Sequence, residues 1–397
     1  MESRALRRRA LGVGLLAMLA SSPGQTYMVS AFHGAWTAEL GLSKTLLGTW
    51  YAAGSLAASS CLVVVGRFSD RYGPRTALAF VALALGVGCG VISMAESGVA
   101  LALGFFLIRL FGQGSMGLVG GHAVALAFDE GLGRAEGLRV SAISVAVGVA
   151  PGIAVASIAA IGWRATYVAL GMAVILIVVP ASRLLPKPAA APIQAPLPTK
   201  STDASLHTAI RTRAYAAIGL AVGLHAAAVT AVHFHSQPLF AAAGFSGPSS
   251  AARGMSLFAI CMFLASLFGG WLVDRLRWGM PFALSSLLLA VSMVLLMGHW
   301  GSSGMFAGMV LLGLAQGLGG VAIVPSVTRC FGRAHFGVVR GSLATLTVAG
   351  ASLGPIVLGF AADHLGGFSP GLLVFALACV PAGLMSLLFL RESSKGS

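Results

Sequence analysis

Twelve long apolar runs, joined by mostly short polar segments, dominate this sequence of 397 residues. They cover residues 10–32, 45–66, 76–95, 99–126, 138–160, 165–185, 214–236, 253–273, 281–299, 304–329, 339–362 and 369–390. A helix needs about 20 apolar residues to cross the hydrocarbon core of a bilayer, and these runs have about that length. Backbone groups inside a bilayer must pair with one another, which a helix achieves within one segment. The sequence therefore predicts an all-α membrane protein with twelve transmembrane helices.

Composition agrees with a lipid bilayer as the main partner. Hydrophobic residues make up 57% of the chain and charged residues only 9%, whereas soluble proteins carry about 25% charged residues. The net charge of +14 does not indicate nucleic acid, because basic residues flanking membrane helices account for it. The five cysteines are scattered through the apolar runs without a CxxC pair, so we expect neither disulfides nor a metal site.

The positions of the basic residues predict the orientation. With the N-terminus in the cytoplasm, 21 of the 25 Lys and Arg residues fall at cytoplasmic ends and loops. Only Lys44, Arg164 and Arg253 fall outside, and Arg109 lies within a run. Since Lys and Arg accumulate in cytoplasmic loops, both termini are predicted to be cytoplasmic. The short loops favour a bacterial inner membrane protein.

The chain divides into two similar halves. A Pro- and Ala-rich segment at 186–198, followed by polar residues, predicts a cytoplasmic linker over 186–213 between domains at 1–185 and 214–397. Three motifs repeat at an offset of 203 or 204 residues: Gly66-Arg-Phe-Ser-Asp70-Arg71 with Gly270-Trp-Leu-Val-Asp274-Arg275, Gln113-Gly114 with Gln316-Gly317, and Pro151 with Pro355. Parallel repeats of this kind are typical of transporters whose site lies between the halves.

These motifs make the chain resemble the major facilitator superfamily over nearly its whole length. Gly66-Arg-Phe-Ser-Asp70-Arg71-Tyr-Gly73-Pro74-Arg75 is similar to that family's cytoplasmic loop signature, although Pro74 replaces a basic residue. Arg109-Leu-Phe-Gly112-Gln113-Gly114 is similar to its fourth-helix motif, and Gly148-Val-Ala-Pro151-Gly152 is a looser match to its fifth-helix motif. The resemblance implies two pseudo-symmetric six-helix bundles and transport by alternating access. It also implies that the first, fourth, seventh and tenth helices line the cavity.

The loop signature predicts a gate on the cytoplasmic side. Asp70 lies where the N-terminus of an incoming helix would favour an anion. Arg71 and Arg75 are suited to hold carboxylates or helix C-termini, and Gly66 and Gly73 permit close approach and a tight turn. The second copy keeps Asp274 and Arg275. The alternative is that these residues only set topology and solubility.

Arg109 is the principal candidate for binding substrate. A charge at bilayer depth costs from ~3 to over ~10 kcal/mol, yet no Asp or Glu falls within any of the twelve runs. A water-filled cavity and an exchangeable anion are therefore the expected partners. The alternative is a structural Arg that bonds to backbone carbonyls or helix ends.

Six further side chains on the presumed cavity helices are candidate substrate contacts. They are Gln25 and Tyr27 beside Pro23, Gln113 one turn after Arg109, His225 and His233 on the seventh helix, and Gln316 on the tenth. Each also has a simpler interpretation. The glutamines would make interhelical hydrogen bonds, Gln25 and Tyr27 would pack at a kink, and the histidines would be packing residues.

These features favour a secondary transporter. The sequence has no Walker-type loop, HExxH, GxSxG or paired carboxylates, so we expect neither an enzyme nor a cofactor. A buried Arg without a buried carboxylate favours a small, monocarboxylate-like organic anion as the substrate. Within the family, the chain then resembles the monocarboxylate and other organic-anion carriers. Transport would be proton-coupled, with His225 or His233 as proton sites, or would exchange anions; symport and antiport both stay open. The alternative is proton-coupled efflux of hydrophobic drugs. A monomer is expected.

Overall fold

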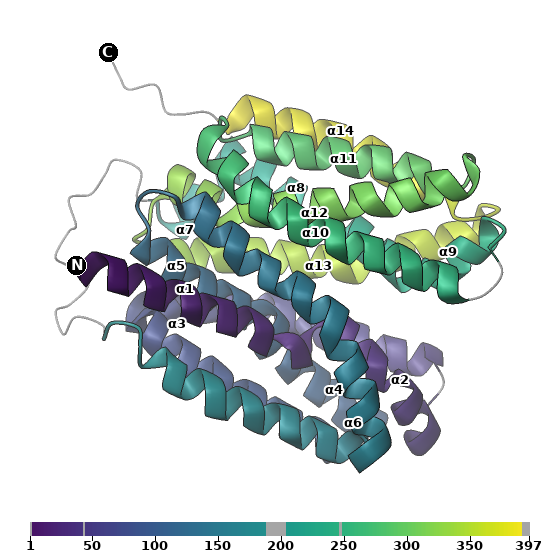
Figure 1. Ribbon diagram of the computed structural model, residues 1–397, viewed down its shortest axis with the longest axis horizontal. Helices are drawn as coiled ribbons and strands as arrows, with labels where there is room; N and C mark the ends of the chain where they lie inside the picture. The colour runs from purple at the N-terminus through teal and green to yellow at the C-terminus, as the bar shows by residue number, and fades with distance from the viewer. Residues whose placement is uncertain (1, 43, 188–203, 246–247, 391–397) are drawn as a thin grey trace. The chain divides into compact units, whose positions relative to one another are not determined.

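The computed structural model describes residues 2–42, 44–187, 204–245 and 248–390, and all regular structure in these ranges is helical. Most of the chain lies in long helices (Figure 1). In chain order the elements are α1 (Glu2–Ala20), η1 (Ser22–Gly24), α2 (Thr26–Leu40), α3 (Lys44–Ser93), α4 (Gly98–Ile108), η2 (Arg109–Met116), α5 (Gly117–Ala127), α6 (Leu132–Ser182), α7 (Leu206–Ala209), α8 (Arg213–Phe234), α9 (Ser236–Ala242), α10 (Pro248–Arg275), α11 (Met280–Leu295), α12 (Gly301–Phe331), α13 (Phe336–His364) and α14 (Ser369–Phe389).

Within the described ranges, eight helical segments are long and apolar enough to cross a membrane, and α11 is a shorter apolar helix. Two of the eight, in α3 and α6, are about twice the length that one crossing requires. The all-helical membrane fold is therefore confirmed. The number of twelve crossings and the cytoplasmic location of the termini stay predictions.

A glycine with a positive φ angle divides each of the two longest helices. Gly73 in α3 has φ 75° and ψ 159°, and Gly162 in α6 has φ 78° and ψ 162°. Such a conformation strains any residue with a Cβ, so glycine suits both breaks. Pro74 follows Gly73 directly and fits the first turn of the next helical segment, which needs no N–H there. The breaks fall between predicted runs 45–66 and 76–95, and between 138–160 and 165–185.

The first predicted run, 10–32, is interrupted in the structure. The α-helix ends at Ala20, a short 3₁₀ turn covers Ser22–Gly24, and α2 starts at Thr26. Pro23 lies within this turn, where it lacks the N–H that a continuing helix would use. The interruption leaves main-chain carbonyls available for other partners.

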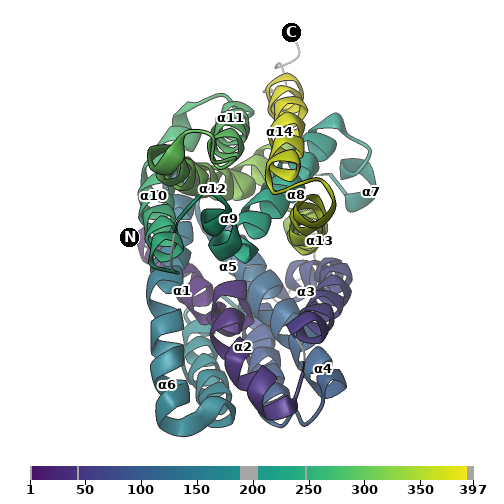
Figure 2. The ribbon, with the colours of Figure 1, turned by 90° about the vertical axis from the view of Figure 1, so that its right-hand side faces the viewer.

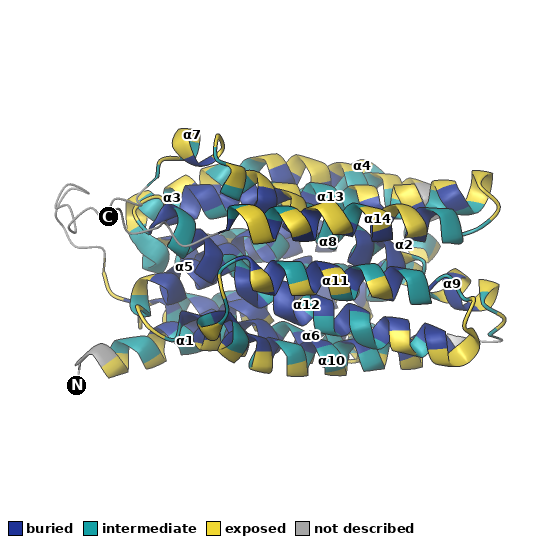
Figure 3. Ribbon diagram, turned by 90° about the horizontal axis from the view of Figure 1, so that it is seen from above, coloured by how far each residue is buried: buried dark blue, intermediate teal, exposed yellow. Residues whose placement is uncertain are grey.

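The long helices carry apolar side chains on their outer faces as well as inside. Phe268 is 71% exposed, Leu176 66% and Val64 64%. Helices such as α11 and α14 show buried and exposed residues alternating along their length (Figure 3). Extensive exposed apolar surface marks a membrane-facing protein.

The described chain forms two compact units. Unit 1 comprises Met1–Glu130, Val145–Leu206 and Phe331–Thr345, and unit 2 comprises Gly131–Ser144, His207–Cys330 and Leu346–Ser397. In unit 1, α3 packs along α4 and α1 along α5; in unit 2, α14 packs against α11 and α8 (Figure 2). The predicted domains at 1–185 and 214–397 stay a prediction. Most of the predicted linker, residues 188–203, lies outside the described residues.

Candidate substrate and gating sites

Arg109 lies in unit 1, at the start of a π-helical segment in the middle of a membrane helix. The segment η2 covers Arg109–Met116 between α4 and α5, and Ser115 Oγ donates to the Leu110 carbonyl five residues back, 2.7 Å away. π-Helical turns are rare and occur frequently at functional sites. Gly24 lies against this segment, because a Cβ built on it would fall 2.0 Å from the Ile108 carbonyl oxygen. A glycine is required at this crossing.

The Arg109 guanidinium is held by neutral oxygens. Its Nε donates to Ser55 Oγ at 3.0 Å, and its Nη1 donates to the Gly24 carbonyl at 3.0 Å and to Thr26 Oγ1 at 3.2 Å. Its Cζ lies 4.9 Å from the ring centroid of Tyr51, a cation–π distance. The 3₁₀ turn at Pro23 therefore supplies a carbonyl that Arg109 uses. Its Nη2 makes no hydrogen bond within the described chain.

The charge of Arg109 is not neutralised by any described carboxylate, although the residue is only 3% exposed. The ion pairs found among the described residues do not include it. Hydrogen bonds to neutral oxygens solvate a guanidinium but leave its net charge unbalanced. Arg109 is therefore held by structural hydrogen bonds, and it keeps a positive charge that no described carboxylate balances.

The other unit 1 candidates lie around the start of α2, with Gln25 just before it and Tyr27 in its first turn, and in η2, which holds Gln113. Gln25 Nε2 donates to Ser21 Oγ at 3.0 Å, and Tyr27 Oη lies 3.0 Å from Ser22 Oγ. Both side chains thus support the interruption between α1 and α2. Gln113, four residues after Arg109, has a buried Oε1 without a hydrogen-bond partner. A buried polar atom of this kind is uncommon and calls for a water or a ligand.

Two of the three candidates of unit 2 line a small cavity. His225 of α8 and Gln316 of α12 line a space of about 60 Å³ together with Ser285 of α11. His225 Nδ1 lies 3.4 Å from Ser285 Oγ, while His225 Nε2 and Gln316 Oε1 are buried without a hydrogen-bond partner. His233 is not among the residues that line this space. It meets Phe258 edge-on at 4.4 Å and also has an unpartnered Nε2.

The Asp70 carboxylate lies at the N-terminus of α13. Its Oδ1 accepts from the Gly337 N–H at 2.6 Å and its Oδ2 from the Val338 N–H at 2.8 Å, both in the first turn of α13. A Cβ on Gly66 would lie 2.1 Å from the Gly337 carbonyl oxygen, so the glycine permits the approach of α13 to α3. The carboxylate thus caps the end of a helix whose first amides lack intrahelical acceptors.

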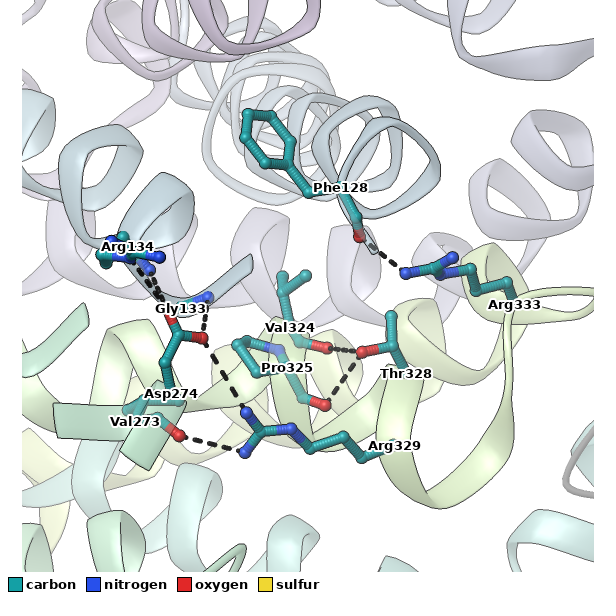
Figure 4. Close-up of polar contacts among 10 residues, drawn as sticks. All are labelled: Phe128, Gly133, Arg134, Val273, Asp274, Val324, Pro325, Thr328, Arg329 and Arg333. Carbon is teal, nitrogen blue, oxygen red and sulfur yellow. Dashed lines mark hydrogen bonds and ion pairs between the residues drawn. The ribbon is translucent and has the colours of Figure 1, made fainter. Parts of the chain in front are cut away.

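Asp274 repeats this arrangement in unit 2 (Figure 4). Its Oδ1 accepts from the Gly133 N–H at 2.8 Å and its Oδ2 from the Arg134 N–H at 3.1 Å, in the first turn of α6. Two cations lie beside it: Arg134 Nε at 3.5 Å and Arg329 Nη2 at 3.9 Å. The repeated sequence motif therefore produces the same helix cap twice, each time within one unit.

The remaining gate candidates have local contacts. Arg75 Nη1 donates to the Leu185 carbonyl just beyond the end of α6, at 3.4 Å, as expected of a residue that holds a helix C-terminus. Arg71 lies over the Tyr72 ring at 5.3 Å and Arg275 over the Trp271 ring at 4.0 Å. Neither of these two arginines forms an ion pair with a described carboxylate.

Sequence reasoning missed two polar groups. His122 Nδ1 lies 2.8 Å from Ser69 Oγ and its Nε2 lies 3.8 Å from Asp70 Oδ1, so this histidine supports the Asp70 cap. No local pattern links a residue of α5 to the loop signature. The second group is an ion pair between Glu136 and Arg139.

Glu136 lies outside the twelve predicted apolar runs, yet the structure buries it. It is fully buried, and it accepts two hydrogen bonds from Arg139, from Nε at 2.7 Å and from Nη2 at 2.6 Å. The spacing of three residues on a helix is a local signal for this pair. The sequence gives no such signal that Glu136 is buried, because this residue precedes the predicted apolar run at 138–160.

Comparison with known proteins agrees with this architecture. The sequence profile of the Major Facilitator Superfamily matches residues 13–252, which is more than half of the chain. No curated protein matches the chain in sequence.

Two solved structures have the same fold. One is the Major Facilitator Superfamily transporter FucP in an outward conformation, with a TM-score of 0.73 and 16% identity, over 96% of this chain and 98% of that one. The other is the human organic anion transporter MFSD10 (TETRAN), with a TM-score of 0.72 and 17% identity, over 96% of this chain and 99% of that one. The profile match, the helical fold and the repeated helix caps lead to one conclusion: the chain belongs to the major facilitator superfamily.

Proposed function

We propose that this protein is a secondary transporter that moves a small, monocarboxylate-like organic anion across the membrane by alternating access. Membership of the family implies secondary transport, and its members are carriers rather than enzymes. The substrate class rests on one observation, the uncompensated charge of Arg109. Coupling to protons and exchange of one anion for another both fit this proposal.

The environment of Arg109 supports an anion as its exchangeable partner. Three hydrogen bonds to neutral oxygens and the Tyr51 ring hold the guanidinium in place, and its Nη2 makes no hydrogen bond within the described chain. In a low-dielectric setting, a fixed cation without a counter-ion attracts an anion strongly. A carboxylate at Nη2 would add a charge-assisted bond without displacing any contact already made. Gln113, with its unpartnered Oε1, completes the candidate contacts of unit 1.

The two helix caps are the proposed gates. Asp70 and Asp274 each bind the first turn of a helix through a pair of backbone amides. In alternating access such contacts must form and break, and carboxylate-to-amide bonds are strong enough to favour one state yet weak enough to open. Gly66, Gly73, Arg71, Arg75 and Arg275 are assigned to the same gates as supporting residues.

Efflux of hydrophobic drugs, coupled to protons, is the second candidate function. The observation that favours it is the set of neutral partners around Arg109, which would suffice for a purely structural role. Under this alternative, substrate would contact apolar surfaces and Arg109 would stay bound to Gly24 and Ser55. A location in a bacterial inner membrane and a monomeric state belong to either proposal.

The test is a thermal-unfolding series on purified protein with small carboxylates, sugars and lipophilic cations. A ligand at ~100 times its dissociation constant should stabilise the protein by about 2.7 kcal/mol. We expect carboxylates to stabilise the wild type and the Ser55→Ala variant, which keeps the charge of Arg109, but not the Arg109→Gln variant. Stabilisation of all three proteins by lipophilic cations, with no effect of carboxylates, would contradict the anion proposal and support efflux.

A further inference from the structure

We propose that unit 1 carries a binding site for an anionic phospholipid at Arg67 and Arg71 of α3, just beyond the predicted apolar run 45–66. The ligand is a membrane lipid whose head group has a net negative charge and whose acyl chains lie along exposed apolar side chains of the same unit. Three features of the molecule point to this ligand: the helix face that holds both arginines, their lack of a counter-ion, and the different residues at the equivalent positions of unit 2.

Arg67 and Arg71 continue an apolar face of α3 beyond the end of a membrane span. Val64 is exposed, and Arg67 and Arg71 follow it at intervals of three and four residues and are exposed as well. Residues at this spacing lie on one face of a helix. Asp70, by contrast, is directed to the first turn of α13. Because Val64 falls within the apolar run and Arg67 follows that run, the two guanidinium groups lie where a helix passes from the hydrocarbon to the lipid head groups.

No described carboxylate neutralises these two charges. The ion pairs found among the described residues include neither Arg67 nor Arg71. Arg71 lies instead over the Tyr72 ring, with its Cζ 5.3 Å from the ring centroid. Like charges four residues apart on a helix repel each other. A phosphate between the two side chains would remove this repulsion, and guanidinium groups bind phosphate through charge-assisted hydrogen bonds.

Aromatic rings connect the two arginines with the apolar part of unit 1. The ring centroid of Phe68 lies 4.7 Å from that of Tyr72 and 5.2 Å from that of Phe80, and Phe80 lies 5.9 Å from Phe111. Tyr72 is 42% exposed and Phe80 47%. Tyr is enriched at membrane interfaces, where one side of the ring is apolar and the other is hydrated. A phospholipid can therefore use both the cations and these rings, whereas free phosphate can use only the cations.

Unit 2 has a different pair of residues at the equivalent positions. The repeat offset of 204 residues aligns Arg67 with Trp271 and Arg71 with Arg275. Trp271 and Arg275 are both exposed, and Arg275 Cζ lies 4.0 Å from the Trp271 ring centroid. Unit 2 thus presents one cation stacked on an aromatic ring, where unit 1 presents two cations. We therefore expect the anionic lipid at unit 1 and not at unit 2.

The lipid site does not depend on the transport proposal. It lies within unit 1, it does not involve Arg109, and its test measures lipid binding. Failure of the carboxylate assay would leave it unaffected, and its own failure would leave the role of Arg109 unchanged. Because Arg71 is also assigned to a gate, the test changes Arg67 and leaves Arg71 in place.

The experiment is native mass spectrometry of the purified protein in detergent, titrated with phosphatidylglycerol or with phosphatidylcholine of the same acyl chains. The method separates each protein–lipid stoichiometry and gives the dissociation constant of the first bound lipid. We expect phosphatidylglycerol to bind with the lower dissociation constant. Glycerol 3-phosphate at the same concentration, which has the phosphate but no acyl chains, should not displace it.

Three variants then locate the lipid. The Arg67→Gln variant should bind phosphatidylglycerol about fivefold more weakly, as expected for the loss of one Arg near an anionic head group. The Trp271→Arg variant gives unit 2 the two cations of unit 1 and should bind a second phosphatidylglycerol. The Arg277→Gln variant removes an exposed charge of unit 2 and should bind the lipid like the wild type.

Each of these expectations can fail separately. Equal dissociation constants for the two lipids, or displacement by glycerol 3-phosphate, would overturn the proposal of an anionic phospholipid. Unchanged binding in Arg67→Gln, an equal loss in Arg277→Gln, or no second lipid in Trp271→Arg would overturn its assignment to the pair Arg67 and Arg71.

Discussion

The helix cap made by Asp70 leads to a quantitative prediction about two backbone amides. In the first turn of α13, the N–H groups of Gly337 and Val338 have no intrahelical acceptor, and both donate to the Asp70 carboxylate. The Asp70→Ala substitution removes that acceptor and leaves the rest of α13 unchanged. Hydrogen exchange at these two amides should therefore rise selectively.

The structure supplies the expected magnitude. The two bonds are short, 2.6 and 2.8 Å, and a hydrogen bond to a charged group contributes about 1.5–3 kcal/mol. Since about 1.4 kcal/mol is tenfold in an equilibrium constant, exchange at each amide should accelerate roughly ten- to 150-fold. His122, 3.8 Å from Asp70 Oδ1, does not contact these amides and cannot replace the carboxylate without moving.

The assay is hydrogen–deuterium exchange with mass spectrometry on the protein in nanodiscs, using overlapping peptides that contain Gly337 and Val338. Asp274→Ala is the matched control, because it should expose Gly133 and Arg134 of α6 and leave α13 protected. Unchanged exchange at the start of α13 in Asp70→Ala would refute the reasoning. So would the same response of both helices to both substitutions.

Two other predictions concern charged pairs. The Glu136→Gln substitution removes the carboxylate that pairs with buried Arg139 and should destabilise the protein by about 3–5 kcal/mol in thermal unfolding. A double variant that combines Glu136→Gln with Arg139→Met should recover part of this loss, because the buried positive charge of Arg139 is then absent as well. If Glu136→Gln unfolds like the wild type, the buried pair carries no net stability. At Glu39, hydrogen bonds from the Trp163 indole and the Arg164 guanidinium hold the pKa of the carboxyl below its usual 4.5. The ionised Glu39 carboxylate therefore stabilises the folded protein above about pH 4.5, and this stabilisation is lost as the pH falls through the lowered pKa. The Glu39→Gln variant should therefore show a flatter decline of melting temperature below about pH 4.5, and an identical acid profile in both proteins would contradict this.

The sequence alone determined the class of the protein and the positions of its principal motifs. An apolar run long enough to cross a bilayer must satisfy its backbone hydrogen bonds within itself, and a helix does so. The sequence therefore predicted the all-helical membrane fold. The repeated motif placed Asp70 and Asp274 at equivalent positions, and the structure gives both the same cap on a helix N-terminus. The sequence also indicated the family, because the family's loop signature is a local sequence pattern.

Tertiary structure alone decided which groups meet. The partners of Arg109 come from residues 24, 26 and 55, more than fifty positions away, and no local pattern specifies such contacts. His122 reaches Asp70 from α5, and Glu136 is buried although it stands beside a polar loop. In unit 2, His225 of α8 and Ser285 of α11 come to lie 3.4 Å apart although they are 60 positions apart in the sequence. Helix periodicity tells which face of a helix is apolar, whereas the packing of distant helices decides which polar atoms find partners and which are left without them.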